Sequence, residues 1–373
     1  MPLSATTFDE EEPRRVREAL AGRVAGNGPF GQKVERRLEA LLGAPRVLLT
    51  TSCTHALELA LMAHGIGPGH EVVLPSFTFV STANAILRVG ARPVFADIED
   101  RTLGLDAEDV ARRLSPRTAA ILPVHYAGVA PDMDALIALA RPRELRIIED
   151  AAQGLAASYR GRALGTLADG GCFSFHETKN ITCGEGGALA LDDPEVAARA
   201  EVIREKGTNR SAFLRGEVDK YTWVAEGSSY VLSDLLAAVL DAQLDKLPAI
   251  QEKRAAAAAR YHAGLADWAR TSGVCLPPSW TDRQVNHHLF YVLMPDAASR
   301  DRLQARLRAL GVLATFHYVP LHSAPHGRAL GLDSGDLPVT ESVAGRLLRL
   351  PLHAELTGGD VDRVVDAVRR SFP

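Results

Sequence analysis

The chain has 373 residues, of which 46% are hydrophobic and 24% charged, with a formal net charge of −4 and a pI near 6.3. This composition is typical of a globular protein with one large and one smaller domain, and the lack of basic excess argues against nucleic acid and anionic membranes as partners. No apolar run approaches the length of a membrane span, and the 4 cysteines form no CxxC pair, so we expect a cytoplasmic protein with reduced thiols.

Short apolar runs alternate with stretches of helical period through the first half of the chain. The predicted strands are 46–50, 71–75, 92–98, 118–124, 146–150 and 172–175, and the predicted helices are 54–64, 81–90, 106–114 and 132–140. Several of these helices open on Thr, Ser or Asp, which are favoured as helix N-caps. The alternation predicts an α/β fold with a large, mostly parallel sheet sandwiched by helices.

An Ala- and Leu-rich helical stretch follows from Ser233 to about Asp267, and Pro248 is expected to interrupt it. We take this break as the boundary between a large domain over 1–247, with an N-terminal arm, and a smaller C-terminal α/β domain over 248–373. The smaller domain contains the apolar run 288–295 and the amphipathic stretches 301–311 and 360–372.

Reactive side chains follow several of the predicted strands. Asp150 ends a strand that is expected to be buried, where a carboxylate is costly unless it meets a positive partner. Lys179 comes just after another strand, and the hydroxyl-rich residues 51–54 run straight into a helix whose free N–H groups suit a phosphate. Phe77 and Phe79 bring aromatic rings to the same edge. A Schiff-base lysine, an aspartate for a pyridinium, a phosphate cup and a flat ring together indicate pyridoxal 5'-phosphate.

Each feature also has an ordinary structural explanation. Asp150 alone would more often be a helix cap or an ion-pair partner, Lys179 a solvated turn residue, and the phenylalanines part of the core. Their coincidence at strand ends favours the cofactor. A metal site at His317, His322 and His326 is a further alternative, but no thiol or carboxylate motif accompanies these histidines, so no metal is predicted.

Longer segments resemble the nucleotide-sugar aminotransferases of the DegT type, which adopt the aspartate aminotransferase fold. The segments are GCFSFHETKN with GEGGAL, EDAAQG, PSFTFVSTANA and PVHYAGVAPDMD, followed by REKGTNRS, VDKYTW, GSSYVLSD, FHYVPLH and RLLRLPL. They cover nearly the whole chain and are most similar to the dTDP-4-keto-6-deoxyglucose 4-aminotransferases. The resemblance implies transfer of an amino group from L-glutamate to C4 of dTDP-4-keto-6-deoxy-D-glucose, giving a dTDP-4-amino-4,6-dideoxy sugar, with the galacto product favoured over gluco.

The resemblance also implies roles for individual residues. Lys179 would form the Schiff base and move protons, and Asp150 would keep the ring nitrogen protonated. Further cofactor contacts would come from Cys53, Thr54, Phe79, Gln153, Ser174 and Ser229. Ser229 stands where many relatives carry an Asn that reaches the phosphate of the neighbouring subunit, which puts that contact in doubt. Sugar-nucleotide contacts would come from Arg210, Lys220, His317 and Tyr318.

The polar segment 205–223 is too long for an ordinary connector, which indicates a functional loop. By the same resemblance it would cross into the active site of a partner, so that a homodimer with shared active sites is the catalytic unit. A solvated surface loop is the alternative.

Other functions remain open at this stage. The acceptor of an aminotransferase could carry its keto group at C3 or be linked to UDP. A non-catalytic nucleotide-sugar-binding regulator of the same fold is a different class, but it would have no reason to keep Lys179, Asp150 and the phosphate cup together. A related branch that removes a sugar hydroxyl replaces the lysine by histidine, so Lys179 argues against that activity.

Overall fold

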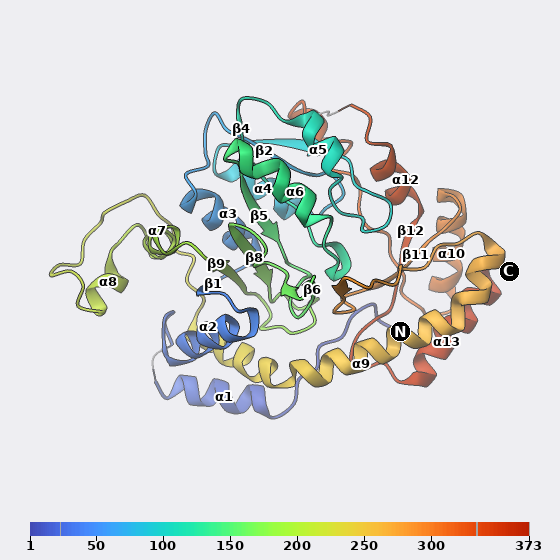
Figure 1. Ribbon diagram of the computed structural model, residues 1–373. Coiled ribbons are helices and arrows are strands. Elements are labelled where there is room, and N and C mark those ends of the chain that lie inside the picture. The colour runs from blue at the N-terminus through green and yellow to red at the C-terminus, as the bar shows by residue number, and fades with distance from the viewer. Residues whose placement is uncertain (23, 333–334, 373) are drawn as a thin grey trace.

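A computed structural model describes residues 1–22, 24–332 and 335–372. Within these ranges the main sheet has seven strands in the order β1-β9-β8-β5-β4-β2-β3 (Figure 1). All run parallel except β9, which is antiparallel to both of its neighbours. The strands are β1 (Arg46–Thr50), β2 (Glu71–Pro75), β3 (Arg92–Ala96), β4 (Thr118–Ile121), β5 (Arg146–Asp150), β8 (Gly170–Ser174) and β9 (Gly187–Leu191).

The predicted α/β class is confirmed, and the predicted strands 46–50, 71–75 and 146–150 coincide with β1, β2 and β5. Strand β9 was not predicted. Its sequence GALAL consists of small and apolar residues without β-branched members, so its composition gives no strand signal. All five of its residues are buried, and the strand lies between β1 and β8.

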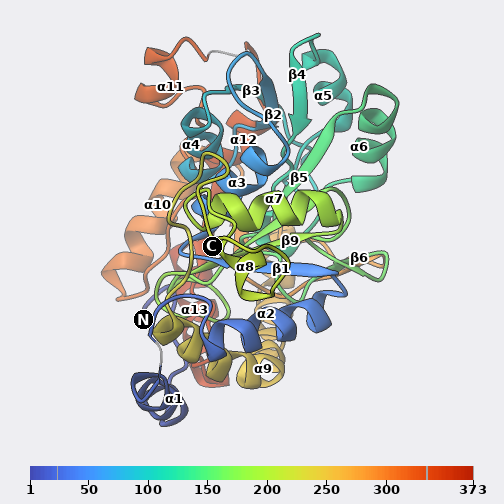
Figure 2. The same cartoon turned by 90° about the vertical axis from the view of Figure 1, so that its left-hand side faces the viewer.

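Helices cover both faces of the sheet because successive side chains of each strand point to opposite sides. One face packs against α3, α4 and α7. The other packs against α2 and α9 over β1, β9 and β8, and against α5 and α6 over β2, β3 and β4 (Figure 2). The helices are α1 (Glu11–Leu20), α2 (Pro29–Leu42), α3 (Cys53–Ala63), α4 (Val80–Arg88), α5 (Ala107–Arg113), α6 (Met133–Ala140), α7 (Pro194–Arg204) and α9 (Asp234–Ser272).

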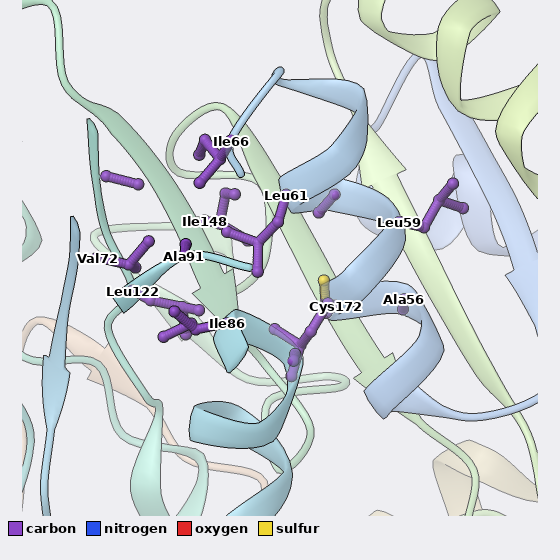
Figure 3. Packing of buried hydrophobic residues seen from close by; sticks show 14 of the residues in the cluster. Ala56, Leu59, Leu61, Ile66, Val72, Ile86, Ala91, Leu122, Ile148 and Cys172 are labelled. Atoms are coloured by element: carbon purple, nitrogen blue, oxygen red, sulfur yellow. The ribbon is translucent and has the colours of Figure 1, made fainter. Parts of the chain in front are cut away.

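Helix α3 is fixed firmly onto the sheet. Figure 3 shows Ala56 and Leu61 of this helix facing Ile148 of β5 and Cys172 of β8. All four side chains are buried in one apolar cluster. Burial of each large apolar side chain contributes about 1.5–3 kcal/mol, so the packing holds the first turn of α3 in register with the ends of β5 and β8.

The expected interruption at Pro248 is wrong, because α9 is one helix of 39 residues. Pro248 lies on its exposed side, where water can satisfy the carbonyl that lacks an amide donor. The division into domains at this residue stays a prediction. Beyond it, the second half of α9 shares an apolar cluster with the C-terminal elements β11 (Phe290–Leu293), α10 (Ala297–Ala309), β12 (Leu347–Leu350) and α13 (Gly358–Ser371).

The N-terminal residues join this C-terminal unit rather than the main sheet. The carbonyls of Met1 and Leu3 accept hydrogen bonds from the amides of Leu313 and Leu352, at 3.1 and 3.2 Å.

The remaining described elements are short: β6 (Ser158–Tyr159), β7 (Arg162–Ala163), α8 (Arg210–Leu214), β10 (Arg283–Gln284), α11 (Pro325–Ala329) and α12 (Pro338–Arg346), with single turns at Tyr126–Gly128 and Arg141–Arg143. None of the helices in the described ranges combines the length and apolar character needed to cross a bilayer.

Candidate functional site

The N-terminus of α3 presents free backbone amides beside the ends of the central strands. Ser52 caps the helix, its hydroxyl accepting from the amide of His55 at 3.1 Å. The amides of Cys53 and Thr54 have no hydrogen-bond partner within the described residues. Gly187 passes so close that a β-carbon there would lie 2.3 Å from the Ser52 carbonyl carbon. Glycine at the start of β9 therefore leaves this helix start as an anion-binding cup.

Asp150 ends β5 and is buried. Its carboxylate accepts a hydrogen bond from the Thr82 hydroxyl of α4 at 2.8 Å and from the Ala152 amide at 3.1 Å. Burial raises the pKa of Asp150, and these two donors oppose the rise. The hydrogen bond from the Ala152 amide joins residues only two positions apart, as expected if Asp150 were an ordinary capping residue. Among the described residues, however, no cation forms an ion pair with this carboxylate, so it remains available to a positive partner.

Lys179 lies in the loop between β8 and β9 and is only partly exposed. Burial lowers the pKa of its amine, and Arg349 lowers it further, whereas Cys53 and Asp150 act in the opposite direction. In the described part of the chain the amine has no hydrogen bond or ion pair. A surface lysine would pay no such desolvation cost. An amine that is buried, unpaired and lowered in pKa suits nucleophilic chemistry.

The residue after Lys179 is clamped from a distant part of the chain. The side-chain Nδ2 of Asn180 donates to the backbone carbonyl of Asn286 at 2.9 Å. The side-chain Oδ1 of Asn180 contacts Nδ1 of His288 at 2.9 Å. Arg254 of α9 in turn donates to the carbonyls of His287 and His288, at 3.0 and 2.5 Å. These contacts fix the backbone that carries Lys179 against α9.

Aromatic side chains form one wall of the site. Phe77 is fully buried, as the core alternative expected, whereas Phe79 at the start of α4 is 58% exposed. The ring of Tyr318 lies 5.5 Å from Phe77 and 6.5 Å from Phe79, and it stacks on His317 at 4.0 Å. Gln153 donates to the Tyr318 hydroxyl at 3.3 Å. The predicted residues Phe79, Gln153, His317 and Tyr318 are therefore brought together.

His317 connects this wall to an arginine that sequence reasoning did not single out. Its Nε2 contacts Nη1 of Arg349 at 2.5 Å, and its Nδ1 contacts the Tyr126 hydroxyl at 3.2 Å. Burial, together with Arg349 and Lys179, lowers the pKa of His317 to about 2. The imidazole is therefore neutral and cannot act as a general acid near neutral pH.

The other predicted contacts lie in different places. Ser174 ends β8, and its hydroxyl accepts from the His176 amide at 3.4 Å. Ser229 is exposed, and its backbone forms an isolated antiparallel β-bridge with Glu205. Arg210 begins α8, and Lys220 follows it in the loop that projects from the body of the molecule in Figure 1. The structure does not bring these last two residues to Lys179 within one chain.

The three histidines considered as metal ligands are not gathered into one site. His322 contacts the Ser76 hydroxyl at 2.7 Å and Glu341 at 2.9 Å, while His317 binds Arg349 and His326 lies on α11. Across residues 1–22, 24–332 and 335–372, no three His, Cys, Asp or Glu side chains form a group that would hold a metal ion.

These features fit pyridoxal phosphate. The helix start offers two amides to its phosphate, the unpaired Asp150 carboxylate suits a protonated ring nitrogen, and the unpaired Lys179 amine suits its aldehyde. Three contributing residues were missed by sequence reasoning: Thr82, Asn180 and Arg349. Each lies inside a motif that carried the family resemblance, but its own contact spans distant segments and leaves no local signal.

Comparisons with known proteins identify the family of the chain. Residues 6–369 match the DegT/DnrJ/EryC1/StrS aminotransferase family. The spore coat polysaccharide biosynthesis protein SpsC of Bacillus subtilis (strain 168) is 35% identical over 99% of this chain and 96% of its own length. The crystal structure of the aminotransferase TlmJ from Streptoalloteichus hindustanus is 36% identical, covers 100% of this chain and 98% of its own, and superposes with a TM-score of 0.91.

A third relative bears on the cofactor. The putative sugar aminotransferase Spr1654 from Streptococcus pneumoniae, in its PMP-form, is 26% identical, covers 100% of this chain and 98% of its own, and has a TM-score of 0.93. The same protein has also been solved in a PLP-form. The predicted resemblance to the DegT-type aminotransferase family is confirmed.

Proposed function

Because the chain belongs to the DegT/DnrJ/EryC1/StrS aminotransferase family, whose members are pyridoxal phosphate-dependent sugar aminotransferases, we propose that it aminates C4 of dTDP-4-keto-6-deoxy-D-glucose with L-glutamate as donor. The product is the dTDP-4-amino-4,6-dideoxy sugar of galacto configuration. The observation that carries the reaction class is the buried, unpaired amine of Lys179 beside the Asp150 carboxylate.

Lys179 and Asp150 have complementary tasks in this proposal. When bound, pyridoxal phosphate supplies a carbonyl carbon that carries the amino group and a ring that accepts the electron pair of a broken C–H bond. The amine of Lys179 takes the proton from the α-carbon of glutamate and later delivers a proton to C4 of the sugar. Asp150, with Thr82 and the Ala152 amide stabilising its charge, keeps the ring nitrogen protonated.

The remaining cofactor contacts position these two groups. The amides of Cys53 and Thr54 at the start of α3 would hold the phosphate, together with the hydroxyl of Ser174 at the end of β8. The exposed ring of Phe79 would contact the cofactor, and Gln153, held by Tyr318 and by the Ala127 amide at 2.7 Å, would help to orient it.

The choice of acceptor rests on segments outside the cofactor contacts. The motifs HETKNIT, TNRS, DKYTW and FHYVPLH resemble the 4-aminotransferases, and FHYVPLH contributes His317 and Tyr318 to the aromatic wall. A neutral histidine and an aromatic ring suit an uncharged hexose, whose hydroxyl groups need hydrogen-bond partners and whose ring carbons need apolar contact. The relative SpsC is named for polysaccharide biosynthesis, which supports an activated sugar as acceptor.

We further propose that the active unit is a homodimer. Phe213, Leu214, Tyr221 and Trp223 are all exposed on the projecting loop, with Trp223 at 77%. An apolar loop of this kind is stabilised only when another surface covers it. A partner chain would bury these side chains and bring Arg210 and Lys220 to the diphosphate of the sugar nucleotide, and Ser229 to the cofactor phosphate.

The two half-reactions can be followed separately. The cofactor-loaded protein should lose its yellow absorbance when L-glutamate is added and regain it when dTDP-4-keto-6-deoxy-D-glucose follows. A protein that binds the cofactor but shows no change with any amino acid would be a regulator rather than an aminotransferase.

A further inference from the structure

The guanidinium of Arg349 is an uncompensated cation beside Lys179. Its strand β12 pairs with β11, and its backbone amide donates to the Thr315 carbonyl at 2.7 Å. No acidic side chain in the described part of the chain forms an ion pair with it. Burial lowers the pKa of Arg349, and its charge also lowers the pKa of Lys179. A buried cation without an acidic partner, close enough to lower the pKa of Lys179, calls for an anion beside it.

The Nη1 group of this guanidinium has a hydrogen-bond partner, whereas the edge formed by Nε and Nη2 has none in the described residues. Nη1 is in contact with Nε2 of His317 at 2.5 Å. Because arginine can only donate, Nε2 must accept, so the proton of the neutral imidazole sits on Nδ1 and points to the Tyr126 hydroxyl at 3.2 Å. The Nε–H group of Arg349 is buried without a partner in the described residues, and Nη2 also makes no hydrogen bond there.

The open edge identifies the chemistry of the ligand. The parallel N–H groups of Nε and Nη2 form the fork that binds both oxygens of a carboxylate. A phosphate has its own place at the start of α3, and the Asp150 carboxylate is directed to Thr82 and the Ala152 amide. From this geometry we infer that Arg349 binds a carboxylate of the amino donor, and that His317 is a positioning residue that keeps the fork turned toward it.

This inference rests on the proposed amine transfer and names a residue that selects its donor. The donor must bring both an amine and a carboxylate close to Lys179, which an α-amino acid does and a sugar does not. The acceptor ketosugar carries no carboxylate, so Arg349 contributes to only one of the two half-reactions.

The test compares Arg349→Gln with wild type in the cofactor-loaded protein. Loss of charged hydrogen bonds of about 1.5–3 kcal/mol should weaken glutamate binding by about 10- to 100-fold in the first half-reaction. The second half-reaction, started from the aminated form with the ketosugar, should stay within about threefold of wild type, which also shows that the variant is folded. Arg346→Gln is the matched control, because Arg346 donates to the Met294 carbonyl at 2.6 Å, away from these groups.

A second readout does not depend on turnover. Glutarate carries the carboxylates of glutamate without its amine, and calorimetry should show that it binds wild type and Arg346→Gln but not Arg349→Gln. Equal glutarate affinity in Arg349→Gln, or an equal loss in both half-reactions, would overturn the inference. His317→Gln should raise the glutamate KM in the wild-type background but not further in Arg349→Gln, because it acts on glutamate through that arginine. If wild type binds glutarate through Arg349 yet transfers no amine from glutamate, it is the proposed function that fails.

Discussion

The Thr82 hydroxyl donates a hydrogen bond to the buried carboxylate of Asp150 at 2.8 Å, joining the first helical turn after Phe79 to the end of β5. The bond stabilises the ionised carboxylate against the rise in pKa that burial causes. It also fixes the direction of the carboxylate. In the proposed reaction, the negative charge that faces the cofactor ring would therefore be held in place by a helix start and a strand end.

Asp150→Asn should bind the cofactor but transfer amine at least about 100-fold more slowly, since a neutral amide cannot hold the ring nitrogen protonated. Thr82→Val should slow transfer by about tenfold through loss of one charge-assisted hydrogen bond. Single-turnover absorbance with glutamate measures both. Near-normal rates for Asp150→Asn at saturating cofactor would contradict its role.

Lys179→Ala should abolish amine transfer, by at least about 10⁴-fold, and leave the fold unchanged. The lost group is chemical, and its amine makes no contact that stabilises the described structure. Circular dichroism and turnover in parallel would separate the two effects. Turnover like that of wild type in this variant would refute the assignment.

The lowered pKa of Lys179 predicts a pH-dependent stability of the cofactor-free protein. Between the folded pKa and the ordinary value of 10.5 the unfolded chain binds more protons, so the wild-type free energy of unfolding rises with pH in that window. Lys179→Met removes the buried charge. It should therefore exceed wild type in stability near neutral pH, by a margin that shrinks as the pH approaches 10.5. Urea unfolding across this range measures the margin, and a margin that grows with pH would show that the amine is not desolvated.

Trp223→Ser should weaken the proposed dimer and reduce activity together, because Trp223 is the most exposed large apolar side chain of the projecting loop. Light scattering and turnover at matched protein concentrations would follow both. Leu310→Ser, at another exposed apolar position on α10's C-terminal side, is the control and should change neither. Full activity in a strictly monomeric sample would rule out shared active sites.

The parts of this fold that could be predicted from the sequence are those with local patterns. Apolar runs identified β2 and β5, and Asp106 and Asp132 located the starts of α5 and α6 as their caps. Helix α3 begins at Cys53 with Ser52 as its cap, just before the predicted start at Thr54. The continuous helix through Pro248 could not be predicted, because it depends on which side of α9 faces solvent. The Arg349 fork could not be predicted either, because it exists only when His317, far away in the chain, lies against it.

The proposed acceptor and regiochemistry are tested most directly by the product. The protein is incubated with pyridoxal phosphate, L-glutamate and dTDP-4-keto-6-deoxy-D-glucose, and the H3–H4 coupling of the purified sugar nucleotide is read by proton NMR. We predict an amine at C4 with a small coupling, as an axial amino group in the galacto configuration requires. A large coupling would contradict the galacto assignment, and an absence of aminated sugar while the cofactor is demonstrably bound would contradict the proposed acceptor.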